Sequence, residues 1–335
     1  MSLDLLQSAC FVFVGLFFAA YTVLDGFDLG IGILFPFLGR TPMGKRTLLK
    51  ALAPVWDGNE VWLLAGVTVL LGAFPAVYAT VFSGFYLAVI LTIVALMMRA
   101  VSFEFWSTEE GPRRLWDMLF TAGSLIPPLL LGIALGNVIE GVPLYLKEYN
   151  GTLLTLFRPY PVMVGILGVL VVSIQGASYA AMKTTGELQE RARRLRGKLL
   201  LVFPIALTVL AVLTYAAVPV HLGGIVAWAG IALAVAAWVS MMVPRVASSD
   251  RLVFLASSAT IGSLWLVAGG LLFPDLVRAT TPEIPEHIPL TVYNSSSPEG
   301  TLLFVVAVAA IGLPIVVIYT FFVYRVFKGK VTPIA

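Results

Sequence analysis

Long apolar stretches separated by short polar segments recur along the whole chain. A helix needs about 20 mostly apolar residues to cross a hydrocarbon core of roughly 30 Å. Nine stretches meet this requirement and predict nine transmembrane helices, near residues 9–38, 51–73, 77–98, 115–136, 160–182, 199–218, 223–243, 252–273 and 301–327. The expected fold is therefore an all-α, polytopic membrane protein in which residues 1–335 form a single integral-membrane domain.

The composition of the 335-residue chain agrees with a membrane location. Apolar residues make up 59% of it and charged residues 12%, whereas a typical soluble domain is about half apolar and about a quarter charged. This composition excludes a soluble enzyme, a disordered chain and a nucleic-acid-binding protein. The single cysteine, Cys10, also excludes an internal disulfide and a cysteine-built metal cluster.

The basic residues are distributed unevenly between alternate connecting segments. Of the 21 Lys and Arg residues, only Lys147, Arg158 and Arg278 fall in one set of connections, and the other 18 fall in the alternate set. Cytoplasmic loops are enriched in Lys and Arg, so the N-terminus is predicted to lie outside and the C-terminus in the cytoplasm. The N-terminal residues lack the basic start of a cleaved signal peptide, and we expect the first apolar stretch to remain as a span.

Four carboxylates lie inside the predicted spans, where a charge at the bilayer centre costs at least ~2.5–3.5 kcal/mol. Asp25 and Asp28 belong to the first span, and Asp57 and Glu60 to the second. Each pair has i,i+3 spacing and so shares one helix face. The predicted topology brings all four to a similar depth toward the cytoplasm, with Asn59 beside them.

These acids have two interpretations. Burial and mutual repulsion favour the protonated form of a carboxyl group, so a group of acids with Asn59 and trapped water can form a proton relay. Alternatively, the acids pair with Arg99, Lys50 or a partner subunit and only hold helices together. The nearby Gly26, Gly30 and Gly32 either permit close helix approach or mark a local loosening of the first span.

Two further features bear on function. His221 and His287 fall in predicted outer connections, so axial haem ligation by this chain is not expected. A proton-coupled secondary transporter would also carry intramembrane acids near a glycine-rich break. The predicted nine spans show no detectable inverted repeat, which argues against this alternative.

Several motifs resemble subunit II of the cytochrome bd quinol oxidases, the respiratory terminal oxidases of bacteria. WDGNEVW, at 56–62, is the most specific of them. The motifs run in the same order from residue 3 to the C-terminus and include YTVLDGFDLGIGIL at 21–34, APVWDGNEVWLL at 53–64, FPAVYATVFSGFY at 74–86, MMRAVSFEFW at 97–106, GSLIPPLLLGIALGNVIEGVPL at 123–144, QGASYAAMKTTGEL at 175–188 and LTVYNSSSPEGTL at 290–302.

The resemblance implies a fold and a setting for the chain. Its nine spans would form two four-helix bundles and one peripheral helix in the bacterial plasma membrane. The partner would be subunit I, which holds two b haems and one haem d and oxidises membrane quinol, while this chain carries no haem. Together they would act as an electrogenic quinol:O2 oxidoreductase.

The resemblance also implies roles for individual residues. In this family the acids of the LDGFD and WDGNE motifs line a proton route from the cytoplasm toward the oxygen-reducing haem. This role carries over most directly to Asp25 and Asp57, and then to Asp28, Asn59 and Glu60, although some members have Gln in place of Glu60. Some members also hold a structural quinone in this subunit, and a small single-span accessory subunit is a further partner that the resemblance allows.

Overall fold

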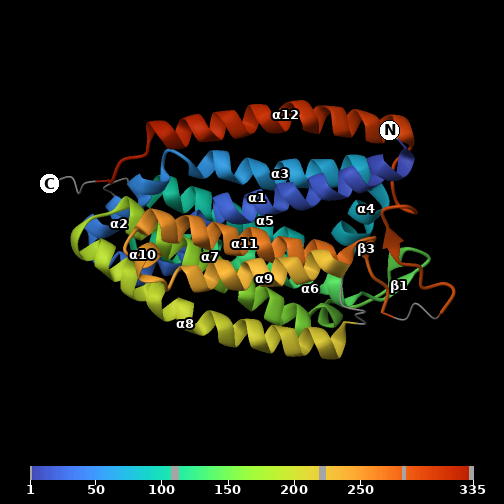
Figure 1. Cartoon of the computed structure of the whole chain (residues 1–335), viewed down its shortest axis with the longest axis horizontal. Coiled ribbons are helices and arrows are strands. Elements are labelled where there is room, and N and C mark those ends of the chain that lie inside the picture. The colour runs from blue at the N-terminus through green and yellow to red at the C-terminus, as the bar shows by residue number, and fades with distance from the viewer. Residues whose placement is uncertain (1, 107–112, 219–223, 281–283, 332–335) are drawn as a thin grey trace.

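The computed structural model describes residues 2–106, 113–218, 224–280 and 284–331, and most of them are helical. The helices are α1 (Leu3–Leu38), α2 (Pro42–Leu52), α3 (Trp56–Ala73), α4 (Pro75–Gly84), α5 (Tyr86–Trp106), α6 (Arg113–Glu140), α7 (Pro159–Lys183), α8 (Gly186–Ala217), α9 (Gly224–Ser240), α10 (Pro244–Ala247), α11 (Asp250–Leu272) and α12 (Glu299–Val326), with a 3-10 turn, η1 (Leu153–Leu156). Four short strands, β1 (Leu144–Tyr145), β2 (Glu148–Tyr149), β3 (Asp275–Val277) and β4 (Leu290–Thr291), form two antiparallel pairs. The long helices lie side by side along the longest axis of the molecule (Figure 1).

Seven of the described helices are long and apolar enough to cross a membrane: α1, α5, α6, α7, α8, α11 and α12. The all-α, polytopic membrane fold is therefore confirmed. Helix α9 has 17 residues, which rise about 26 Å at 1.5 Å per residue. Helix α3 is less apolar because Asp57, Asn59 and Glu60 lie near its start. The count of nine spans remains a prediction for these two helices.

The boundaries of two predicted spans are wrong. The second was predicted to begin at residue 51, but α2 continues to Leu52 and α3 begins only at Trp56. The third was predicted as one helix over 77–98, but it is divided between α4 and α5. At this break a Cβ on Gly84 would lie 2.6 Å from Tyr149 Cγ, so the glycine allows β2 to pack against the end of α4.

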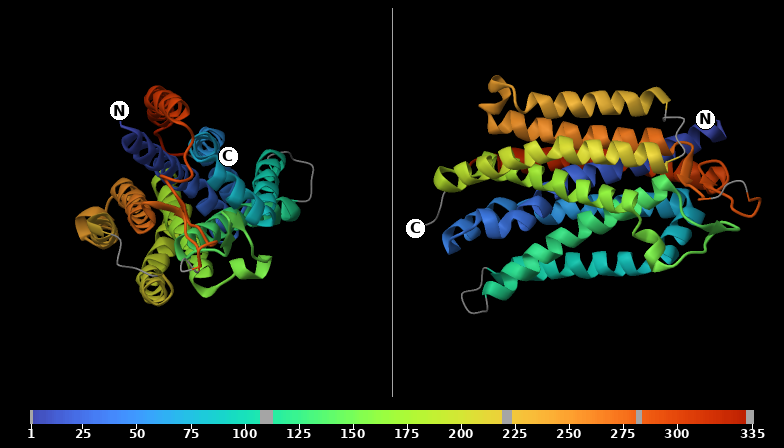
Figure 2. Two further views of the ribbon diagram at one scale, coloured as in Figure 1. Left: turned by 90° about the vertical axis from the view of Figure 1, so that its right-hand side faces the viewer. Right: turned by 90° about the horizontal axis from the view of Figure 1, so that it is seen from below.

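Helix α1 lies at the centre of the packing. It packs against α3, α6, α7, α11 and α12, while α5 packs on α6, and α7 also packs on α8 and α11. Helix α12 lies at the edge of the bundle beside α1 and α3 (Figure 2). The half of α1 that contains the two aspartates is thus enclosed by helices from both the first and the last part of the chain.

The backbones of α1 and α7 touch at a pair of glycines. A Cβ on Gly176 would lie 2.5 Å from the backbone nitrogen of Ile31, and one on Gly30 would lie 2.9 Å from the backbone nitrogen of Gly176. Both distances are shorter than any tolerable contact, so neither position accepts a side chain. Gly30 therefore serves close helix approach, and the alternative of a loosened span is wrong because α1 is continuous across this region.

The chain connections gather at the two ends of the bundle. Helices α1 and α12 begin at the end that carries the strands, and α2 and α10 lie at the other end, where α12 finishes (Figure 1). The segment before α12 caps α3, because the Ser297 amide and hydroxyl donate to the carbonyls of Ala73 and Gly72 at 2.8 and 2.7 Å.

Candidate functional site

Helices α1, α3 and α5 bring polar residues together inside the bundle. Asp25 and Asp28 come from α1, Asn59 and Glu60 from α3, and Arg99 from α5. Both aspartates are fully buried, and Arg99 and Asn59 are each only 2% exposed. These five residues, which we call the acid cluster, include four of the five residues that the sequence predicted for a proton route.

Arg99 is the cation of the acid cluster. Its Nη2 and Nη1 atoms donate to Asp25 Oδ1 and Oδ2 at 2.8 and 3.0 Å. Nη1 also lies 3.2 Å from Oε1 of Glu60, whose side chain is 26% exposed. Such a two-pronged contact is the strongest geometry for an arginine–carboxylate pair. The ion pairing weighed from the sequence is therefore confirmed for Asp25 and Glu60.

Asp28 has a different environment from Asp25. Its Oδ2 accepts a hydrogen bond from Asn59 Nδ2 at 2.7 Å. Asn59 Nδ2 also donates to the Leu24 carbonyl at 3.2 Å, and Asn59 Oδ1 accepts from the Tyr324 hydroxyl at 3.0 Å. The second oxygen, Asp28 Oδ1, is buried without a hydrogen-bond partner among the described residues. Within the described part of the chain, Asp28 therefore has no direct cation partner equivalent to the one that holds Asp25.

Asp57 does not join the acid cluster. It is exposed on the second residue of α3, whereas Asn59 is buried. Successive helical residues turn by about 100°, so positions two apart face nearly opposite directions. The sequence predicted that Asp57 shares its depth with the other three acids but did not predict its direction. Helix α3 turns that side chain away from the interior while it turns Asn59 inward.

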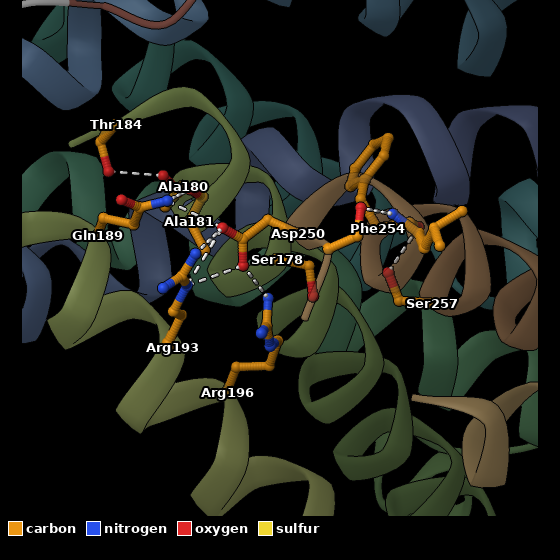
Figure 3. Close-up of polar contacts among 12 residues, drawn as sticks. Ser178, Ala180, Ala181, Thr184, Gln189, Arg193, Arg196, Asp250, Phe254 and Ser257 are labelled. Carbon is orange, nitrogen blue, oxygen red and sulfur yellow. Dashed lines mark hydrogen bonds and ion pairs between the residues drawn. The ribbon is translucent and has the colours of Figure 1, made fainter. Parts of the chain in front are cut away.

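A second carboxylate–arginine cluster joins α8 to the start of α11 (Figure 3). Arg193 donates to Asp250 through Nε and Nη2 at 3.0 and 2.7 Å, and Arg196 Nη1 donates to Oδ1 at 3.2 Å. Gln189 Nε2 donates to Asp250 Oδ2 at 2.9 Å. This group, the Asp250 cluster, has two cations around one acid, and both carboxylate oxygens are fully hydrogen-bonded.

Sequence reasoning missed the part that Tyr324 plays. The hydroxyl comes from α12, 265 positions after Asn59. A tyrosine near the end of an apolar stretch resembles many tyrosines of the membrane interface, so no local pattern distinguishes it. The sequence indicated Arg99 only as one of several possible partners of the acids. Its position near the end of a predicted span did not show which way its side chain points.

The described part of the chain contains no group of three or more His, Cys, Asp or Glu residues arranged to hold a metal ion. His287 lies in the connection between β3 and β4, and its place on the outer side of the membrane stays a prediction. His221 lies outside the described residues. The absence of haem from this chain remains a prediction.

Comparison with known proteins gives consistent matches over nearly the full length. The family model of cytochrome bd terminal oxidase subunit II matches residues 6–327. The chain is 31% identical over 366 residues to cytochrome bd-I ubiquinol oxidase subunit 2 of Escherichia coli strain K12, covering 98% of this chain and 96% of the relative. It is 29% identical over 333 residues to cytochrome bd ubiquinol oxidase subunit 2 of Bacillus subtilis strain 168, covering 98% and 97%.

The fold agrees with these matches. The structure of bd oxidase from Geobacillus thermodenitrificans contains a chain that superposes with a TM-score of 0.79 at 18% identity, covering 96% of this chain and 98% of that one. The chain therefore belongs to the cytochrome bd terminal oxidase subunit II family, and it is a multi-pass membrane subunit of a bacterial respiratory quinol:O2 oxidoreductase.

Proposed function

We propose that this chain supplies protons from the cytoplasm to the oxygen-reducing centre of the oxidase. Asp57 would take up protons at the exposed start of α3, and Glu60, half-buried one turn further on, would pass them to the buried acids. Asp25, Asp28 and Asn59 would form the inner part of the route. The exposure of these residues decreases in this order, from Asp57 to Glu60 to Asp28.

The observation that carries the proposal is the charge imbalance of the acid cluster. Arg99 is the cation of the acid cluster, and it faces the carboxylates of Asp25 and Glu60. Asp28 is a third acid in the same group. One arginine neutralises one carboxylate, and further buried negative charges are costly in a low-dielectric interior. The remaining acids can be neutralised by binding protons. A carboxyl group that binds a proton for this reason can also release it to a neighbouring group.

The proposed reaction is that of the assembled enzyme, 2 quinol + O2 → 2 quinone + 2 H2O. Family membership implies haem in the complex and a partner subunit I. We propose that two b haems and one haem d lie in that partner and supply the electron transfer and oxygen chemistry when bound. The residues of this chain would hold and move protons, and its helices would form a scaffold for subunit I. A small single-span accessory subunit and a structural quinone in this chain remain proposals.

The proposed topology has nine spans, with the N-terminus outside and the C-terminus in the cytoplasm. It is supported by the positions of α1 and α12, which begin at the same end of the bundle (Figure 1). The helix contacts agree with one bundle of α1, α3, α5 and α6, a second of α7, α8, α9 and α11, and a peripheral α12. No feature of the acid cluster favours the secondary transporter over the oxidase.

Replacement of Asp57 by Asn in the assembled oxidase tests the route at its entrance. Asn keeps the size of the side chain but cannot carry a proton. Turnover is expected to fall about tenfold, less than the ~100-fold loss usual for a positioned acid or base, because solvent can partly replace a group at the entrance. Haem content should be unchanged.

Oxygen consumption and proton uptake during reoxidation of the reduced enzyme are the measurements. Asp250→Asn is the matched control, because that acid is surrounded by cations and lies outside the route. Wild-type turnover and proton uptake in Asp57→Asn at neutral and alkaline pH would refute the role of Asp57.

A further inference from the structure

A chain of hydrogen bonds reaches the acid cluster from the peripheral helix. The Tyr324 hydroxyl of α12 lies 3.0 Å from Asn59 Oδ1, and Asn59 Nδ2 lies 2.7 Å from Asp28 Oδ2. The same nitrogen lies 3.2 Å from the carbonyl oxygen of Leu24. Tyr324 is therefore connected to Asp28 through a single amide side chain.

The direction of these hydrogen bonds is fixed by chemistry. A backbone carbonyl can only accept, so the side-chain atom of Asn59 that faces Leu24 must be the NH2 group. The amide oxygen of Asn59 then faces Tyr324, whose hydroxyl must donate to it. The bonds thus run from Tyr324 to Asn59 and from Asn59 to Asp28, and Asp28 Oδ2 is an acceptor.

This direction leaves one place for a proton on Asp28. Oδ2 already accepts from Asn59, whereas Oδ1 is buried without a hydrogen-bond partner among the described residues. We infer that Tyr324 is a positioning residue, which acts through Asn59 to hold Asp28 Oδ2 as an acceptor and to direct the exchangeable proton of Asp28 to Oδ1. The inference rests on the proposed function, in which Asp28 exchanges protons.

The surroundings of Tyr324 hold its hydroxyl in place. Its ring meets the ring of Phe27 edge-on, with centroids 6.3 Å apart. Beyond it, the end of α12 is tied to α7, because Lys183 Nζ donates to the carbonyl of Phe327 and the Val331 amide donates to the Lys183 carbonyl at 2.8 Å. These contacts fix the last turn of a helix that otherwise lies at the edge of the bundle.

Infrared difference spectroscopy of the intact oxidase complex tests the inference. The carboxylic-acid C=O band that disappears in Asp28→Asn identifies protonated Asp28, whose carbonyl oxygen would be Oδ2. Tyr324→Phe keeps the ring but removes the donor to Asn59, so the bond from Asn59 to Asp28 should weaken and the band should move to higher frequency. Proton uptake should slow about fivefold, the factor that corresponds to one ordinary hydrogen bond, with haem content unchanged.

Two further variants make the test specific. Tyr319→Phe removes a hydroxyl from the same helix at a side chain that is 60% exposed, and it should leave the band and the uptake rate unchanged. Lys183→Met loosens the end of α12 without altering Tyr324, and it should move the band in the same direction by a smaller amount. Lys183→Met therefore tests the inference even if the Tyr324→Phe complex does not assemble.

The outcomes separate this inference from the proton route. An unmoved band in Tyr324→Phe, or no carboxylic-acid band that depends on Asp28, would overturn the inference. A moved band together with normal turnover in both Tyr324→Phe and Asp28→Asn would support the positioning of Asp28 but overturn its part in the proposed route.

Discussion

The acid cluster and the Asp250 cluster use the same residue types in opposite proportions. In the first, Arg99 faces Asp25 and Glu60, with Asp28 beside them. In the second, Arg193 and Arg196 surround a single acid. Both carboxylate oxygens of Asp250 accept hydrogen bonds, whereas Asp28 Oδ1 has no hydrogen-bond partner among the described residues. We infer that the ratio of acids to cations, rather than burial alone, distinguishes the group proposed for proton exchange from a structural ion pair.

The strongest test of the comparison removes the cation from the acid cluster. Arg99→Met leaves Asp25 buried without its partner, and loss of one member of a buried pair costs about 3–5 kcal/mol. We expect a lower yield of assembled oxidase and a large fall in thermal stability. Haem content per purified complex and the temperature of thermal inactivation measure these effects.

A second substitution shows whether the loss comes from unpaired charge. Arg99→Met combined with Asp25→Asn removes both charges of the pair, so the double variant should be more stable than Arg99→Met alone. Equal or lower stability of the double variant would contradict the assignment of Arg99 as the counter-ion of Asp25.

The next test removes the proton-binding group but keeps its shape. In Asp28→Asn we expect oxygen turnover to fall about 100-fold, the usual effect of losing a positioned acid or base, with all haem retained. Stopped-flow reoxidation with a pH indicator measures the proton uptake directly. If haem is lost together with activity, Asp28 acts in assembly, and the distinction between the two clusters fails.

The smallest effect is expected in the Asp250 cluster. Asp250→Asn removes the negative charge and puts an NH2 donor where one oxygen accepted from Arg193, Arg196 or Gln189, so it should lower stability by about 1–3 kcal/mol. Turnover and proton uptake should remain at wild-type values, because this acid is already neutralised by Arg193 and Arg196. Thermal inactivation and oxygen consumption check the two expectations, and slowed proton uptake would show that the acid-to-cation ratio is a poor guide.

The sequence predicted most of the helical architecture because apolar length and charged loops are local signals. Each predicted span coincides with one helix, except that 51–73 includes the end of α2 besides α3 and 77–98 includes parts of α4 and α5. The break at Gly84 could not be predicted, since it involves Tyr149, a residue 65 positions later in the chain. Such contacts depend on tertiary packing rather than on local hydropathy.

The acid cluster was predicted in part for the same reason. The spacing of Asp25 and Asp28 and the topology placed acids on two neighbouring helices at one depth. The rotation of α3 about its own axis could not be read from the spacing, so the exposure of Asp57 was not predicted. Tyr324 was missed because its contact with Asn59 joins the two ends of the chain.

The contact between Gly30 and Gly176 has a mechanical consequence. The backbones of α1 and α7 touch two residues beyond Asp28, where an added Cβ would collide with the neighbouring helix. Neither helix can slide or roll past the other without opening this contact, so we expect α1 to keep its position relative to α7 during turnover. On the proposed route, protons would pass α1 by side-chain rotation and by exchange along hydrogen bonds. A carrier that rocks its helices between two orientations would have to break such a contact wherever the moving helices meet.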